Sequence, residues 1–203
     1  QSRQFDPVDF LQSCEPWIQA YHLSDNDGTR DSNAVVHLSI ENHVDYMLVN
    51  MWGATADWPY QNFYSAGART NSMGWRFFIW DAEASLGLTD NTDTIGPLEL
   101  HGSLRESAEY RLRFADRALK HLVDADAALT PDPSVARFEE LYALVSPAIS
   151  AHYARWSGGH PSGWHAAQQG YINNNLPDRR DRTLGFLRNA ALYPSTDAPD
   201  FNT

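Results

Sequence analysis

Hydrophobic side chains recur at helical spacing along most of this 203-residue chain. The clearest pattern covers residues 39–53, where one apolar stripe is formed by Ile40, Val44, Met47, Leu48 and Met51. Ser39 stands where a capping residue is expected, and Gly53 stands where a helix ends. Similar spacing predicts further helices over 6–20, 106–123, 130–155, 164–174 and 178–191. Pro147 is expected to break or kink the helix in which it falls.

Two short aromatic segments depart from the helical pattern. Residues 63–66 and 75–80 are rich in Phe, Tyr and Trp, and the turn-like segment 69–74 separates them, which predicts a β-hairpin. Residues 84–103 are rich in Gly, Asp and Thr and are expected to form a long loop. The whole pattern predicts an α+β fold, mostly α, in which residues 1–203 form a single domain.

Charge and composition narrow the class of partner. The formal net charge is −11 and the isoelectric point is about 5.0, so the surface repels phosphate backbones and nucleic acid is not an expected partner. The sequence has no apolar run long enough to predict a membrane-spanning segment. The single cysteine, Cys14, is interpreted as a small buried hydrophobe. The polar segment 24–33 is interpreted as a surface loop, with a degenerate calcium loop as the alternative.

Candidate chemistry surrounds the predicted hairpin. Asp57 and Asn62 lie five residues apart in the loop after the 39–53 helix, and Asp81 follows the second strand. A protein kinase carries its catalytic acid, metal-binding Asn and metal-binding Asp in this order. A hairpin brings its two ends together, so Asn62 and Asp81 are expected to share Mg²⁺, with Asp57 nearby to accept a hydroxyl proton. The alternative is that these residues only form turns and end a strand.

Several segments, in the same order, resemble the bacterial spore coat protein H (CotH) kinase-like family over about residues 35–200. They are Asp45–Asn50, Asp57–Pro59, Asn62–Tyr64, Trp75–Glu83, Arg111–Arg117 and Leu192–Pro194. The resemblance implies an atypical protein-kinase-like C-lobe and transfer of phosphate from ATP to Ser or Thr of a protein. It also implies Mg²⁺ or Mn²⁺ as cofactor, Asp57 as catalytic acid, and Asn62 and Asp81 as metal ligands.

The resemblance also raises an expectation about missing parts. A kinase holds the phosphates of ATP with a Gly-rich loop and a lysine of its N-lobe. No Gly-rich loop lies in the first 35 residues, and the single lysine, Lys120, falls on a predicted helix. We therefore expect ATP to bind through an N-lobe absent from this chain, and the isolated chain to be inactive. The alternative is a non-catalytic surface or scaffold domain. Family habit suggests an extracellular, cell-surface or spore-surface location.

Other residues near the hairpin have open or structural interpretations. Glu83 could assist the metals or be a buried hydrogen-bond partner, and Asp57 with Glu83 could in principle form a glycosidase acid–base pair. The tryptophans of this region are expected in the core rather than under a nucleotide, at Trp58, Trp75 and Trp80.

Two further groups carry weaker signals. His160 and His165 lack a third clustered ligand for zinc and are interpreted as surface or second-shell residues. The basic run Arg179–Arg182 is interrupted by Asp181 and is expected to form a salt-bridged helix surface.

Overall fold

The computed structural model describes residues 36–67, 74–87, 96–157 and 159–196. The two strands are β1 (Phe63–Ala66) and β2 (Arg76–Ile79). The helices are α2 (Ile40–Gly53), α3 (Leu100–Leu104), α4 (Ala108–Leu122), α5 (Pro131–His152), α6 (Ser162–Gly170) and α7 (Leu176–Asn189). The prediction of a mostly helical α+β fold with one small hairpin is confirmed. The predicted helix over 6–20, the loop at 24–33 and Cys14 lie outside the described residues.

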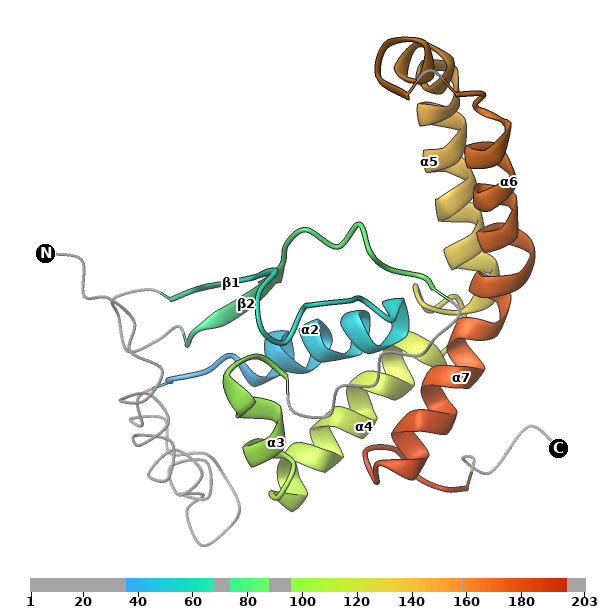
Figure 1. Ribbon diagram of the computed structural model, residues 1–203. Coiled ribbons are helices and arrows are strands. Elements are labelled where there is room, and N and C mark those ends of the chain that lie inside the picture. The colour runs from blue at the N-terminus through green and yellow to red at the C-terminus, as the bar shows by residue number, and fades with distance from the viewer. Residues whose placement is uncertain (1–35, 68–73, 88–95, 158, 197–203) are drawn as a thin grey trace, which may run out of the picture.

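Helix α2 forms the centre of the fold, between the hairpin and the helices α4 and α7 (Figure 1). All five residues of its predicted apolar stripe are buried, and His43, Tyr46 and Asn50 are buried as well. The helix is therefore covered on more sides than an amphipathic surface helix. Ser39 precedes the helix but its side chain does not cap it, and the left-handed residue after the helix is Ala54, with φ of 46°, rather than Gly53.

The hairpin forms as predicted, in an antiparallel register that pairs Phe63 with Ile79 and Ser65 with Phe77. Phe77 is buried against the core, and the strand is extended backward by a parallel bridge between Trp75 and Leu38. The neighbouring Gly74 is required by this bridge, because a Cβ there would lie 2.4 Å from the carbonyl carbon of Leu38.

Helix α4 begins at Ser107, whose Oγ accepts a hydrogen bond from the backbone N–H of Tyr110 at 3.5 Å. Its buried face repeats every four residues, at Tyr110, Phe114, Ala118 and Leu122. Two other apolar residues of the helix, Leu112 and Leu119, are exposed. The narrow i, i+4 stripe is all that the contact with α2 requires.

The C-terminal helices are more continuous than predicted. Pro147 lies inside α5 without ending it, and a π-helical turn, Tyr171–Asn175, joins α6 to α7. The expected loop over 84–103 is wrong at its end, where a 3₁₀ turn, Pro97–Glu99, leads into α3. Burial of Leu100 and His101 outweighs the loop-like composition there. Among the described residues, no helix combines the length and apolar character needed to cross a membrane.

Candidate functional site

The loop after α2 presents Asp57 to solvent beside a deeply buried anchor. Trp58 is fully buried, as predicted for a core residue, while Asp57 is exposed. The Tyr46 hydroxyl donates to the carbonyl oxygen of Trp58 at 3.4 Å, and the two rings meet edge to face with centroids 5.8 Å apart. Burial raises the pKa of Tyr46 above its ordinary value, so this hydroxyl stays protonated as a donor. The anchor fixes the position from which Asp57 projects.

All three predicted site residues have a left-handed backbone. The φ angles are 60° at Asp57, 50° at Asn62 and 53° at Asp81. The carbonyl oxygen of Asp57 closes a turn by accepting from the backbone N–H groups of Tyr60 at 3.4 Å and Gln61 at 3.1 Å. Asp and Asn tolerate this conformation better than most residues, and such backbone is common both in turns and at functional sites.

The hairpin brings Asn62 and Asp81 together. Asn62 directly precedes β1 and Asp81 follows β2 by two residues, at the end where Phe63 pairs with Ile79. The Asn62 Nδ2 donates to the backbone carbonyl oxygen of Asp81 at 3.4 Å, which is a long hydrogen bond. Because the contact uses the main chain of Asp81, its exposed carboxylate stays available to a ligand.

A backbone bridge joins the Asp57 loop to the segment after Asp81. The N–H of Ala56 donates to the carbonyl oxygen of Ala84 at 2.8 Å, and Leu86 donates to Gly53 at 2.6 Å. In the described part of the chain, the hydrogen bonds of Asp57 itself are made by its backbone carbonyl. Glu83, next to this bridge, is exposed, so the alternative that it is a buried hydrogen-bond partner is wrong.

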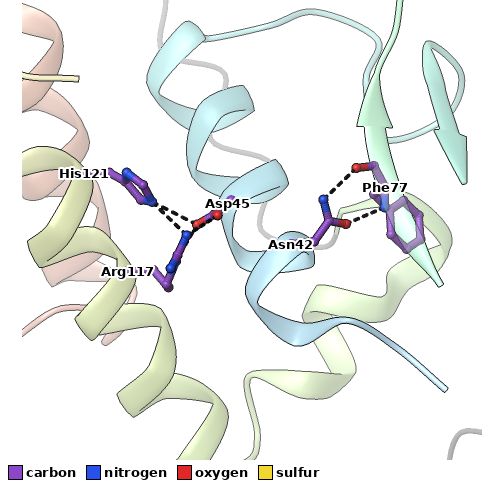
Figure 2. Close-up of polar contacts among 5 residues, drawn as sticks. All are labelled: Asn42, Asp45, Phe77, Arg117 and His121. Carbon is purple, nitrogen blue, oxygen red and sulfur yellow. Dashed lines mark hydrogen bonds and ion pairs between the residues drawn. The ribbon is translucent and has the colours of Figure 1, made fainter. Parts of the chain in front are cut away.

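Helix α2 holds the hairpin through a side chain that imitates a neighbouring strand. The Asn42 Nδ2 donates to the carbonyl oxygen of Phe77 at 3.2 Å, and the N–H of Phe77 donates to Asn42 Oδ1 at 2.7 Å (Figure 2). This pairing continues the edge that Leu38 begins at Trp75. It ties β2, and therefore the segment that leads to Asp81, to the first turn of α2.

A charged cluster holds α2 to α4, as Figure 2 also shows. The Arg117 Nε donates to Asp45 Oδ1 at 2.7 Å, and its Nη2 bonds the other carboxylate oxygen. The His121 Nε2 lies 3.2 Å from Asp45 Oδ1. The hydrogen bonds to Asp45 raise the pKa of Arg117. The cluster therefore acts as a support for the helix that carries the Asp57 loop.

Arg179 is a supporting residue that sequence reasoning missed. It is buried, and it donates to the last carbonyls of α2, at 2.6 Å to Trp52 and 3.3 Å to Met51. The predicted salt-bridged surface is therefore wrong at Arg179. It holds at Arg180, whose exposed side chain pairs with Asp181 at 2.8 Å. The local sequence gives no signal that separates these neighbouring arginines.

A buried histidine pair was also missed. The Tyr110 hydroxyl lies 2.8 Å from His101 Nδ1 and 3.2 Å from His43 Nδ1. Burial lowers the pKa of both histidines to about 3, so both are neutral at ordinary pH. One hydroxyl proton serves only one ring as donor, so the other ring must donate to the hydroxyl, and the two rings hold opposite tautomers.

The remaining aromatic and histidine predictions have mixed outcomes. Trp75 packs against the core as expected, but Trp80 is 57% exposed and lies edge to face with exposed Tyr64 at 4.9 Å. The prediction for Trp80 is wrong because it lies beyond the last pleat that α2 covers. His165 Nδ1 lies 2.9 Å from the Tyr142 hydroxyl, and His160 is exposed.

The arrangement at the open end of the hairpin offers oxygen donors to a hard cation. Among the described residues, no three His, Cys, Asp or Glu side chains form a group that could hold a metal ion by themselves. Mg²⁺ commonly uses only one or two carboxylates and completes its shell with water and phosphate oxygens. The oxygen atoms of Asn62 and Asp81 fit this pattern of Mg²⁺ coordination.

Comparisons of this chain with models of protein families, with curated proteins and with solved structures found no match.

Proposed function

We propose that this chain forms the kinase-like C-lobe of a CotH-type phosphotransferase, which moves the γ-phosphate of ATP to a Ser or Thr hydroxyl of a protein. The observation that carries the proposal is the contact between Asn62 and Asp81 across the open end of the hairpin. An amide side chain that reaches the backbone of an exposed Asp, with a second exposed Asp on an adjoining anchored loop, supplies the parts that phosphate transfer needs from this half of a kinase.

Each residue has a separate role in the proposal. Asp57 accepts the proton of the attacking hydroxyl as that oxygen bonds to the γ-phosphorus, while the bond to the β–γ bridging oxygen breaks and ADP leaves. The Asn62 amide oxygen and the Asp81 carboxylate hold the divalent cation. Bound Mg²⁺, or Mn²⁺ in its place, neutralises charge on the phosphates.

The nucleotide itself is assigned to another part of the protein. Lys120 lies exposed in the last turn of α4 rather than in the Asp57 loop or the hairpin. The proposal therefore places the phosphate-binding lysine and Gly-rich loop in an N-lobe, and it includes an extracellular, cell-surface or spore-surface location.

The test uses the full-length protein with labelled ATP and Mg²⁺. Asp57→Asn and Asp81→Asn should each lower phosphate transfer by at least about 100-fold, because each removes a carboxylate that acts in the transition state. Asp116→Asn is a matched control, since Asp116 is exposed on α4. Transfer that survives both site substitutions contradicts the assigned roles.

A scaffold domain without chemistry is the second candidate, and one observation favours it. The three predicted site residues, all left-handed in backbone, are Asp or Asn, the residues that tight turns select for conformation alone. Calorimetric titration of the full-length protein with ATP and Mg²⁺ or Mn²⁺ separates the two. Saturable, metal-dependent binding contradicts the inert scaffold.

A further inference from the structure

Helix α5 exposes an apolar face along its middle. The helix projects from the body beside α6 (Figure 1), and of its 22 residues Ser134 and Ile149 are the buried ones. Leu144 is 77% exposed, Leu141 45% and Val145 43%. With exposed Ala148 and Ala151 they recur at spacings of three and four and lie on one side of the helix. We call these five residues the α5 face.

The α5 face carries no charge. No Asp, Glu, Lys or Arg occurs between Glu140 and Arg155, in a chain where 20% of residues are charged. An exposed helix face normally carries polar and charged side chains, and a contiguous exposed apolar patch marks a binding surface. A membrane surface is disfavoured as the partner, because a chain of net charge −11 is repelled by anionic lipid headgroups.

We propose that the α5 face binds the α5 face of a second copy of this chain, with the two helices antiparallel. A two-fold dimer brings each surface against itself, so like charges on it would face one another. For two acidic copies, an uncharged apolar face is the surface on which self-association costs least.

Side-chain size sets the orientation. The large residues Leu141 and Leu144 lie toward the N-terminal end of the face, and the small residues Ala148 and Ala151 lie toward its C-terminal end. An antiparallel pair places Leu141 against Ala151 and Leu144 against Ala148 of the other copy, so both of these layers combine a large and a small side chain. A parallel pair would crowd the leucines together and leave the alanines apart.

Charged residues flank the two ends of the face. Glu140 pairs with Arg137 on its own helix at 2.5 Å, and the side chains of both are about two-thirds exposed. In the antiparallel pair Arg155 of the other copy lies level with Arg137 and one turn from Glu140, so the second oxygen of this carboxylate is needed to offset the two facing arginines. The helix dipoles also oppose one another in this arrangement. A single pair of helices buries little surface, so we expect a weak dimer that forms as the concentration rises.

The test is sedimentation equilibrium of the 203-residue chain over a range of concentrations. We expect the dimer to dissociate at least about tenfold more readily in Leu144→Glu, because two buried carboxylates would meet apolar surface. Leu112→Glu is the matched control, since Leu112 is 63% exposed on α4, and it should leave the dissociation constant unchanged. Circular dichroism shows whether each variant keeps its helices.

A second variant tests the orientation. Ala148→Leu should weaken the dimer, because Leu would meet Leu144 of the other copy where the helices are spaced for Ala. A tighter dimer in this variant would mean parallel helices and would overturn the antiparallel pairing. A chain that stays monomeric at every concentration, or a dimer that Leu112→Glu breaks as readily as Leu144→Glu, overturns the α5 face as the interface.

Discussion

Arg179 of α7 donates from its Nε to the carbonyl oxygen of Trp52, 2.6 Å away at the end of α2. The last carbonyls of a helix have no partner within it and carry a partial negative charge. The buried guanidinium supplies both a donor and a positive charge there. Helix α2 ends at Gly53 and Asp57 follows four residues later, so this contact holds the helix end from which the Asp57 loop departs.

We therefore predict that Arg179→Met lowers the free energy of unfolding by about 3 kcal/mol, because it removes the charged hydrogen bonds to the carbonyl oxygens of Trp52 and Met51. Urea denaturation followed by circular dichroism measures the loss. Arg180→Met is the control, since Arg180 pairs with Asp181 at the surface, and it should change stability by no more than about 0.5 kcal/mol. Equal losses in the two variants would contradict the structural role of Arg179.

Asn42 should be nearly as important to the hairpin. Asn42→Ala removes both hydrogen bonds to the backbone of Phe77, and we expect a loss of about 2 kcal/mol together with faster hydrogen exchange at the Phe77 amide. Asn42→Asp keeps the acceptor but sets a carboxylate oxygen against the carbonyl oxygen of Phe77, so it should not restore the lost stability at neutral pH. Asn189→Ala, at the exposed end of α7, serves as control. Unchanged exchange at Phe77 in Asn42→Ala would show that the strand does not depend on this pairing.

The buried histidines predict a loss of stability in acid. Burial lowers the pKa of His43 and His101 to about 3, whereas in the unfolded chain it is about 6.5. Below pH 6.5 the unfolded chain binds more protons than the folded one, so stability falls as the pH drops toward 3 and is unaffected by these groups above that window. Each histidine contributes a slope of up to about 1.4 kcal/mol per pH unit.

The variant His43→Gln isolates this effect, because Gln keeps a hydrogen-bonding side chain but does not titrate. Its unfolding free energy, measured between pH 7 and pH 4, should fall less steeply with acid than that of the unmodified chain. His152→Gln is the control, since His152 is exposed at the end of α5 and should leave the slope unchanged. Parallel curves for all three proteins would mean that His43 takes up its proton without unfolding the chain.

The spacing of apolar and aromatic residues was enough to predict helices and strands, which form between residues close together in the sequence. The apolar stripe of α2 and the aromatic strands gave correct elements, and the hairpin brings Asn62 to Asp81 by strand pairing alone. The metal-binding and catalytic roles of these residues stay predictions, since strand pairing brings the residues together without testing what they bind.

Contacts between distant segments were not predictable in the same way. Arg179 and Arg180 are adjacent in the sequence, and the packing of α7 against α2 buries one of them. His43, His101 and Tyr110 meet across three elements, and no spacing in the sequence marks them as a group. Trp58 and Trp80 each lie next to an aspartate in the sequence. Trp58 is buried against Tyr46 of α2, whereas Trp80 lies beyond the end of β2 and is exposed.

Asn62 allows the conformational and chemical roles of one residue to be separated. Its φ of 50° suits Gly, while Ala pays about 1 kcal/mol for the left-handed backbone. We expect Asn62→Gly to keep the stability of the unmodified chain, because the lost hydrogen bond to Asp81 is long, and Asn62→Ala to lose about 1 kcal/mol.

Both variants lack the amide oxygen, so both should lose metal-dependent ATP binding when the full-length protein is titrated by calorimetry. If the two variants differ in stability but bind Mg·ATP as tightly as the unmodified protein, Asn62 serves the turn alone and the shared cation must be held by other oxygens. If the stable Gly variant loses binding, the loss cannot be attributed to a damaged fold, and the amide itself is the ligand.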